Sequence, residues 1–392
     1  MSSQTPRHTL GELFHFKNGR GFKKTEWGTH GLPIIRIQNL NDEQADFNYF
    51  KGTYEKDILV QQGDLLFSWS GTVGSSFGPH LWTRQDGLLN QHIFKIGFKT
   101  NLELRYAYFA LEHITEEIER SVNGAVGLVH ITKEKLNQFT IPVPTVSEQQ
   151  RIVTILDEAF EGIATAKVNA EKNLQNAREV FKSHLQSTLT QNRKGWTEKL
   201  LCDIATFSSG GTPSKQNASY WKGPIPWVSG RDMKTDRIGD TALHISRAAV
   251  DASSTRIAPI GSLLMLVRGM GLANGVAIAE LVAPCAFNQD IKAIQANSGV
   301  DPRFLLFSLR TKLSESYQIL SNAAHGTLKI DMENLQGITL LIPSLEAQKK
   351  VVKQIDEIQE ETLSLESICR GKLIALEELK KSLLHRAFNG EL

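Results

Sequence analysis

A cluster of basic and aromatic residues near the start of the chain has the composition of a phosphate-binding loop. The stretch HFKNGRGFKK sets basic side chains among phenylalanines and glycines, namely Lys17, Arg20, Lys23 and Lys24. Lysine and arginine neutralise phosphates, and glycine lets the backbone approach one closely. A solvated basic loop would have the same composition, so this stretch by itself leaves both interpretations open.

Side chains that suit contacts with base edges follow predicted strands in both halves of the chain. Arginine pairs with guanine, and asparagine or glutamine with adenine, in the major groove. The segments IIRIQNLND, FSWSGTVG, PWVSGRDMK and LVRGMG carry most of them. Beyond the four basic residues above, the candidates for DNA contact are Arg36, Gln38, Asn39, Ser68, Ser70, Lys215, Ser229, Arg231, Lys234 and Arg268. The related NQH (90–92) and NQD (288–290) are interpreted first as turn-forming segments.

Motifs for catalysis are missing from the sequence. It has no GxxxxGK[ST] phosphate loop, and GMGLANG (269–275) misses the GxGxxG spacing and lacks the acidic residue that holds a ribose. It has no DPPY-like sequence of an amino-methyltransferase and no HExxH, and its three cysteines are scattered. Lone histidines such as His130 and His325 are interpreted as structural. We therefore expect no catalytic residue, no metal site and no cofactor bound by this chain.

Length and composition fit a soluble protein of two or three domains. The chain has 392 residues, 41% hydrophobic and 22% charged, with a net charge of +2. If DNA is the partner, the positive charge must therefore be clustered on one face. No apolar run is long enough to span a membrane, and the first residues do not resemble a secretory signal. These features predict a cytoplasmic protein without membrane contact.

An internal repeat of about 200 residues is the strongest signal in the sequence. A shift of 199 aligns the segments 127–185 and 326–384 without a gap, and a shift of 198 aligns 63–109 with 261–307. Repeats of this kind determine the architecture. Each copy begins with about 140 residues of short β-rich segments broken by Gly, Pro and Asn, and then continues as one long helix.

The helices are predicted from their start signals and their apolar stripes. Thr145 and Glu148 fit a capping box after Pro144, whereas in the second copy Ser344 caps without a returning glutamate. Apolar residues then recur at steps of three and four from Ile152 to Phe181 and from Val351 to Leu383, and Asn389-Gly390 suits a C-terminal stop. About 45 residues per helix predict two rods of about 65 Å that pair as an antiparallel coiled coil.

These motifs together resemble the specificity (S) subunits of type I restriction-modification systems over nearly the full length. The doubled junction IPVPTVSEQQRIVTILDE and LIPSLEAQKKVVKQIDE, the ending LKKSLLHRAFNGEL, and the segments GDLLFSWSGTVG and NQHIFKI carry the resemblance. It implies an α+β fold with two β-rich target-recognition domains (1–143 and 193–342), separated by two long antiparallel helices (144–192 and 343–392) that are related by a pseudo-two-fold repeat.

The resemblance also implies a function in host defence. Each recognition domain would read one half of a bipartite double-stranded DNA sequence, and the helices would set the gap and dock two modification subunits. Those subunits would carry S-adenosylmethionine and methylate adenine N6, and up to two restriction subunits would use ATP and Mg. Three alternatives stay open: a methyltransferase with a fused recognition domain, a recognition subunit without a nuclease, and a coiled-coil scaffold.

Overall fold

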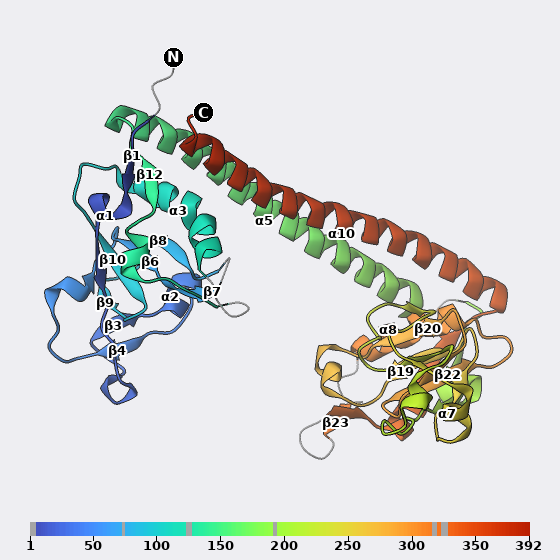
Figure 1. Cartoon of the computed structure of the whole chain (residues 1–392). Helices are drawn as coiled ribbons and strands as arrows, with labels where there is room; N and C mark the ends of the chain where they lie inside the picture. The colour runs from blue at the N-terminus through green and yellow to red at the C-terminus, as the bar shows by residue number, and fades with distance from the viewer. Residues whose placement is uncertain (1–4, 73–74, 123–127, 191–193, 316–319, 323–327) are drawn as a thin grey trace. The chain divides into compact units, whose positions relative to one another are not determined.

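The computed structural model of the chain describes residues 5–72, 75–122, 128–190, 194–315, 320–322 and 328–392 (Figure 1). Packing divides the chain into two compact units. Unit 1 comprises Met1–Glu171 and Arg370–Leu392, and unit 2 comprises Lys172–Cys369. Each unit is a β-rich domain together with parts of both long helices. The predicted α+β fold with an internal repeat and two long helices is confirmed.

Unit 1 is built on two four-stranded sheets with the orders β2-β10-β6-β8 and β4-β3-β9-β5. Short pairs β1-β12 and β11-β7 complete it. Its elements are β1 (Arg7–Thr9), α1 (Leu10–Leu13), β2 (Phe14–Asn18), η1 (Lys24–Glu26), β3 (Leu32–Ile35), α2 (Ile37–Asn41), β4 (Asn48–Phe50), η2 (Lys56–Ile58), β5 (Leu59–Val60), β6 (Leu65–Ser68), β7 (Ser70–Thr72), β8 (Gly78–Leu81), β9 (Gly87–Leu89), β10 (Ile93–Phe98), α3 (Leu104–Ser121), β11 (Leu128–His130), α4 (Lys133–Leu136) and β12 (Thr140–Pro142).

Unit 2 repeats this plan with a five-stranded sheet, β14-β22-β19-β20-β16, and a four-stranded sheet, β17-β15-β21-β18. The pairs β13-β25 and β23-β24 complete it. Its elements are β13 (Thr197–Leu200), α6 (Leu201–Ile204), β14 (Ala205–Ser209), η3 (Ala218–Trp221), β15 (Ile225–Val228), β16 (Arg237–Ile238), β17 (His244–Ile245), α7 (Arg247–Asp251), β18 (Ile257–Ala258), β19 (Leu263–Leu266), η4 (Met270–Asn274), β20 (Ile278–Leu281), β21 (Cys285–Phe287), β22 (Ile291–Ala296), α8 (Pro302–Glu315), β23 (Leu320–Asn322), β24 (Leu328–Ile330), α9 (Met332–Gln336) and β25 (Thr339–Ile342).

The central strands are apolar on both faces because each is covered on both sides. All four residues of β6 are buried, and so are all four of the equivalent β19. In unit 1 one apolar core lies between the first sheet, α3 and the ends of the long helices, and a second core lies under the other sheet. Burial on both sides explains why these strands read as continuous apolar runs rather than as alternating ones.

Both long helices begin where the capping signals predict, and the second also ends where its stop signal predicts. Helix α5 (Val146–Thr190) starts with the Thr145 hydroxyl accepting from the Glu148 N–H at 3.4 Å, and α10 (Leu345–Phe388) starts with the same bond from Ala347 to Ser344. Gly390 beyond α10 has a φ of +74°, as expected for a helix stop. The second half of the predicted capping box is wrong, because the Glu148 carboxylate binds Arg151 at 2.7 and 2.9 Å.

In both units the two helices lie side by side in opposite directions (Figure 1). In unit 1 Lys167 Nζ binds Glu377 at 2.6 Å, and Arg151 binds the Leu392 carbonyl at 2.8 Å. In unit 2 the Arg178 guanidinium binds the Glu366 carboxylate with two hydrogen bonds of 3.0 and 3.1 Å. Leu365, which the sequence places on the apolar stripe, is 52% exposed and lies outside this contact.

Candidate nucleic-acid interface

In unit 1 the loops that carry the predicted contact residues are joined by backbone hydrogen bonds. These loops follow β2, β3, β6 and β9, so four different strand ends meet. The bonds are Arg20 N–H to the Leu89 carbonyl (2.9 Å), Asn90 N–H to the Ile35 carbonyl (3.0 Å) and Trp69 N–H to the His92 carbonyl (3.3 Å). The fold therefore brings together side chains that lie up to 70 residues apart in the sequence.

Unit 2 makes the same three connections between the equivalent loops. They are Gly211 N–H to the Phe287 carbonyl (2.9 Å), Asn288 N–H to the Val228 carbonyl (3.0 Å) and Val267 N–H to the Asp290 carbonyl (2.8 Å). A side chain on Gly19 or on its equivalent Gly210 would overlap the carbonyl oxygens of Asn90 or Asn288. The repeat in the sequence is thus a repeat of one loop assembly, and glycine is needed where two of its loops touch.

The basic residues of the first loop differ in how firmly they are held. Lys17 Nζ binds Asp57 at 3.0 Å, and this hydrogen bond raises the pKa of Lys17. Arg20 is paired with Glu26 and lies over the rings of Phe22 and Phe50 at 5.0 and 4.9 Å. Lys23 and Lys24 are exposed beside it. Phosphate contact by Lys17 or Arg20 would therefore exchange an existing acidic partner for a phosphate.

The loop after β3 holds one exposed and one enclosed polar side chain beside a stacked arginine. The Arg36 guanidinium lies 4.9 Å from the centre of the Trp27 ring, and Gln38 is exposed. Asn39 is only 3% exposed, and its amide donates to the carbonyls of Ala45 and Asp46 at 3.2 and 3.1 Å. Asn39 therefore shapes this loop, and a base contact by its side chain would require these bonds to break.

The two predicted serines of unit 1 lie below the surface. Ser68 is fully buried and its hydroxyl donates to the Ser70 carbonyl at 2.9 Å, while Ser70 is 9% exposed. The rest of their FSWSGTVG segment includes residues 73–74, which lie outside the described residues. Both serines support the loop as it stands, and their contact with DNA remains a prediction.

In unit 2 the predicted arginines and lysines are open to solvent. Lys215, Arg231, Lys234 and Arg268 are all exposed, and none of them forms an ion pair with any residue that the structure describes. Ser229 instead holds its own loop, with both its N–H and its hydroxyl donating to Asp232 at 2.8 Å. Four cationic side chains of this unit are thus available to an anionic partner.

The NQ segments act as turns, as predicted, and they also present an exposed glutamine. The Asn288 side chain accepts from the Asp290 N–H at 3.1 Å, which is a local side-chain turn. Gln91 and Gln289 follow at the same place in each unit, and both are exposed. Gln289 accepts from the Thr212 hydroxyl at 2.5 Å, so its amide group is oriented by the neighbouring loop.

A group of aromatic and imidazole rings in unit 1 was not foreseen from the sequence. The Trp69 ring contacts His92 at 5.3 Å and His130 at 4.6 Å between ring centres. Burial, together with His130, lowers the pKa of His92. His130 is therefore part of the loop assembly, while His325, Gly127 and Gly326 lie outside the described residues. Only the equivalent positions of the SWS and NQH segments within the repeat hinted at this group.

The junction of each β-rich domain with its long helix is also repeated, down to single hydrogen bonds. Gln149 is 1% exposed. Its side-chain oxygen accepts from the Glu103 N–H at 2.9 Å, and its side-chain nitrogen donates to the Pro144 carbonyl at 2.9 Å. Gln348 is fully buried and makes the same pair of bonds with Asp301 and Pro343, at 2.7 and 2.9 Å. This equivalence explains the identical glutamines of the repeat.

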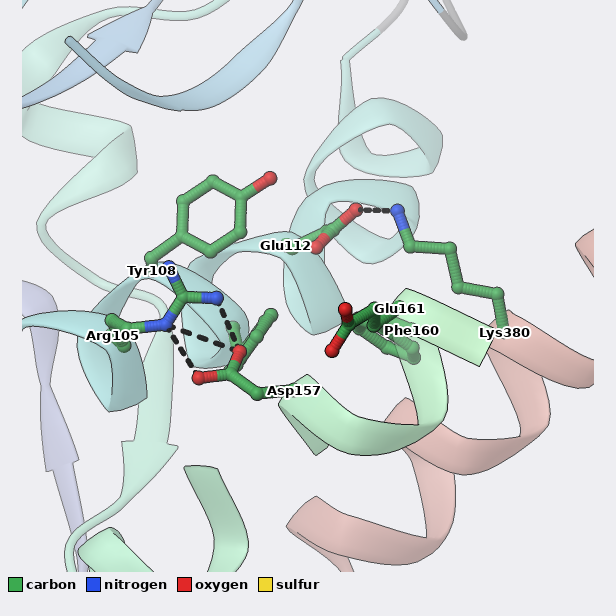
Figure 2. A pocket seen from close by; sticks show the side chains of 8 residues that line it. Arg105, Tyr108, Glu112, Asp157, Phe160, Glu161 and Lys380 are labelled. Carbon is green, nitrogen blue, oxygen red and sulfur yellow. Dashed lines mark hydrogen bonds and ion pairs between the residues drawn. The ribbon is translucent and has the colours of Figure 1, made fainter. Parts of the chain in front are cut away.

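An arginine–aspartate pair reinforces the junction in unit 1 (Figure 2). Arg105 on α3 binds both carboxylate oxygens of Asp157 on α5, with Nε at 3.1 and 2.8 Å. The guanidinium lies 5.4 Å from the Phe109 ring, and the hydrogen bond to Asp157 raises the pKa of Arg105. Nearby, Lys380 binds Glu112 at 2.7 Å, so α3 is joined to both long helices.

The equivalent pair in unit 2 is part of a larger and more buried ionic network. Arg303 is 8% exposed and binds Asp356 at 2.9 and 3.0 Å and Asp236 at 2.8 Å. Burial lowers the pKa of Arg303, but the bond to Asp356 and the charge of Asp236 outweigh it and leave the pKa raised. Burial raises the pKa of Glu280 at the rim of this network.

Within the ranges given above, no group of three or more His, Cys, Asp or Glu side chains is arranged to hold a metal ion. In the same ranges, no helix is long and apolar enough to cross a membrane.

Comparison with known proteins identifies the family. The family model described as "Type I restriction modification DNA specificity domain" matches twice, over residues 7–175 and 193–374. The chain belongs to this family. The two matches follow the internal repeat, because each covers one β-rich domain and most of the helix after it. They also explain why the loop assembly occurs twice.

Relatives of known function are type I specificity subunits. The chain is 26% identical to the EcoR124I/EcoR124II specificity subunit of Escherichia coli over 67% of its own length and 65% of that subunit. It is 21% identical to the EcoBI specificity subunit of the same species over 98% of its length and 86% of that protein. The chain thus spans just under two thirds of the first of these relatives and most of the second.

Solved structures of this type share the fold. One chain, from a study of complex assembly and conformational transition of the type I R-M system, superimposes over the full length with a TM-score of 0.79 at 17% identity. The HsdS subunit from Thermoanaerobacter tengcongensis matches with a TM-score of 0.55 at 16% identity. At these identities the likeness concerns the fold of the specificity family.

Proposed function

We propose that each of the two β-rich domains of this specificity subunit reads one half of a bipartite double-stranded DNA sequence. The observation that carries the proposal is the duplication of the loop assembly. Three equivalent backbone bonds hold equivalent polar loops together in each unit, and each domain is fixed to its own long helix by an equivalent buried glutamine. Two similar but chemically different sets of side chains suit two different half-sites.

The long helices set the distance between the half-sites and dock the partner subunits. Helix α5 has 45 residues and α10 has 44, so each is about 65 Å long. Apolar side chains on these helices face away from the helix pair, with Val168, Val180, Ile368 and Ile374 more than 60% exposed. Two modification subunits would cover such positions, and up to two restriction subunits would complete a restriction complex in the cytoplasm.

In this proposal the subunit directs catalysis without performing it. S-adenosylmethionine binds the modification subunits, which methylate adenine N6, and ATP and Mg bind the restriction subunits. The residues of this chain position the DNA: basic side chains such as Lys23, Arg231 and Arg268 contact phosphates or guanine edges, and the loops carry the sequence preference. Exposed arginines are consistent with this role, because a contact with DNA costs them no ion pair with a described residue.

A methylome measurement tests the proposal. The chain is co-expressed with its genomic modification subunit, and N6-methyladenine is mapped by long-read sequencing. The expected result is one bipartite motif with a fixed gap that disappears when this chain is omitted. A contiguous motif, or methylation that is the same without this chain, would contradict the proposal. Co-expression without a nuclease gene leaves the test valid, because methylation does not require the restriction subunits.

A further inference from the structure

The two units differ at one edge of the main sheet. In unit 2 the edge of β20 is covered by β16, which pairs with it in parallel, Arg237 opposite Glu280 and Ile238 opposite Leu281. In unit 1 the equivalent sheet ends at β8, and no described strand pairs with its outer side. The strand β8 is half-exposed at Pro79, His80 and Leu81. The described residues of unit 1 therefore lack a strand that the repeat supplies in unit 2.

The backbone donors that β16 uses in unit 2 have equivalents in unit 1. In unit 2 the N–H groups of Glu280 and Val282 donate to the carbonyls of Asp236 and Ile238 at 2.8 and 2.9 Å. Leu81 lies opposite Leu65 of β6, as Glu280 lies opposite Leu263 of β19. Leu81 and Thr83 are therefore the equivalents of Glu280 and Val282. The Trp82 N–H donates to the carbonyl of Asp64, the residue just before β6, so the N–H groups on either side of Trp82 point outward. Pro79 has no N–H group to donate, but the pairing of β16 with β20 in unit 2 does not use the N–H at the equivalent position.

The side chain of Asp236 fills a definite place in unit 2. It lies between Arg303 and Arg310 of α8 and Gln359 of α10, at 2.8, 3.9 and 3.1 Å. The shift of the repeat makes Arg105, Glu112 and Phe160 the equivalent residues of unit 1.

In unit 1 these same three residues line an open crevice of about 610 Å³ (Figure 2). The crevice also contains Tyr108, Glu161 and Lys380. No described residue of unit 1 therefore fills the place that Asp236 occupies in unit 2, and Tyr108, Glu112 and Lys380 also line a neighbouring crevice with Pro79 and His80 of β8.

We propose that the edge of β8 and this crevice together bind an extended segment of a partner protein, and that the segment places a lysine or arginine side chain in the crevice. The segment adds a strand beside β8, as β16 does beside β20. Main-chain bonds to Leu81 and Thr83 would supply affinity, and the side chain in the crevice would supply specificity.

The charges of the crevice determine the choice of a basic side chain. Glu112 replaces Arg310 of unit 2, and one of its carboxylate oxygens is buried without a hydrogen-bond partner among the described residues. Glu161 adds a second carboxylate, while Arg105 is already bound to Asp157 and Lys380 to the other Glu112 oxygen. The lining thus holds three carboxylates and two cations. The rings of Phe160 and Tyr108 offer an apolar surface for the stem of a lysine or arginine.

A peptide that copies β16 tests the inference on the full-length chain. The probe is a fluorescent peptide with the sequence of residues 233–240 carrying Asp236→Lys, and its binding is followed by fluorescence anisotropy. We expect saturable binding with a Kd below about 1 mM, and binding about ten-fold weaker when the probe keeps the aspartate. The variant Glu112→Gln should weaken the lysine peptide by a similar factor, whereas Glu117→Gln, an exposed neighbour on α3, should not.

Amide hydrogen exchange shows where the peptide binds. Saturating lysine peptide should slow the exchange of Leu81 and Thr83, which β16 protects at the equivalent positions in unit 2. Absence of saturable binding would overturn the inference, and so would binding that leaves these amides and the Glu112→Gln variant unaffected. Neither result bears on DNA recognition, because the inference does not depend on the proposed function and the methylome measurement is unaffected by the peptide.

Discussion

The predicted DNA-contact side chains are of two kinds, engaged and free. Lys17 and Arg20 are held by acidic partners, and Asn39 and Ser68 by backbone carbonyls, whereas Arg231 is exposed without an ion pair among the described residues. An engaged side chain is already ordered but must give up a bond to reach DNA. A free one pays only the entropy of being ordered, so removing it should report most directly on a contact with DNA.

Replacing Arg231 should weaken recognition of one half-site only. If its guanidinium pairs with a guanine, Arg231→Ala should cost about 1–3 kcal/mol of binding to targets with that half-site intact. Binding by the assembled methyltransferase to DNA duplexes mutated in either half measures this. Arg247→Ala is the matched control, because Arg247 is exposed in the same unit and its ion pair among the described residues is with Asp251 on its own helix. Equal effects of the two changes would remove Arg231 from the contact residues.

The buried glutamines should matter for stability rather than for DNA contact. Gln348→Leu would leave the Asp301 N–H and the Pro343 carbonyl without their partner in a buried site, at a cost of about 1–3 kcal/mol in the free energy of unfolding. Urea unfolding monitored by fluorescence measures this cost. Gln354→Leu, on an exposed turn of the same helix, should change the free energy of unfolding by much less. A similar loss in both variants would contradict a specific role for the junction.

The ionic network of unit 2 should make the free energy of unfolding of this unit depend on pH in the acidic range. Burial raises the pKa of Asp236, but the charge of Arg303 and the hydrogen bond from Gln359 outweigh it and leave the pKa below its ordinary 3.8. A lowered pKa stabilises the fold above the unfolded-state value, and this stabilisation is lost as the pH falls through the folded-state value. The free energy of unfolding of the wild type should therefore exceed that of Asp236→Asn above pH 3.8, and this difference should be lost at pH values below 3.8. Urea unfolding across this range checks it, and a pH-independent difference would argue against the assignment.

At the scale of elements, the distance between half-sites should follow the length of the helices. One heptad inserted into each helix adds about 10 Å, or about three base pairs of DNA. The insertions belong between residues 167 and 178 of α5 and between residues 366 and 377 of α10, because Lys167 faces Glu377 and Arg178 faces Glu366. The methylated motif should keep both halves and gain a longer gap.

A heptad in one helix only is the control for the paired insertion. It would misalign the facing ion pairs of at least one unit, so we expect loss of activity rather than a longer gap. If the paired insertion left the gap unchanged, the helices would not measure the distance.

The elements were predictable where local signals agreed with the repeat. Pro144, Thr145 and Ser344 place the starts of α5 and α10, and Asn389-Gly390 places the end, because caps act through neighbouring backbone groups. The two-residue strand β16 was not predictable, because its pairing with β20 depends on tertiary contacts alone.

In the candidate site, too, features set by local sequence were predictable and features set by tertiary contacts were not. The loops at the strand ends were found from their polar residues and from the repeat. The sequence did not show which of these side chains are free, because the partners of Ser68 and Asn39 are backbone carbonyls that the fold brings near. The Glu148 carboxylate turned to Arg151 for a related reason, since two donors, the Thr145 N–H and the Arg151 guanidinium, competed for it.

At the scale of the whole molecule, exchange of one recognition domain should change half of the target. Replacing residues 10–140 with the equivalent domain of another family member should alter one half-site and leave the other half and the gap as they were. The Gln149 and Asp157 side chains remain in place, so the new domain needs partners for both, equivalent to Glu103 and Arg105. Methylome mapping of the chimera reads the result. A change in both halves would refute independent recognition by two domains.

The division of the chain into units also has a consequence for biosynthesis. Unit 2 is one continuous stretch, Lys172–Cys369, whereas unit 1 joins Met1–Glu171 to Arg370–Leu392, and Phe388 of that last stretch packs on Tyr106. On the ribosome, domains generally fold as they emerge, with the N-terminal one first. Here the first β-rich domain leaves the ribosome early but must wait for the segment 370–392, so the second unit translated is the first that can be completed. A chain that terminates after residue 369 would thus have a complete second unit and an incomplete first one.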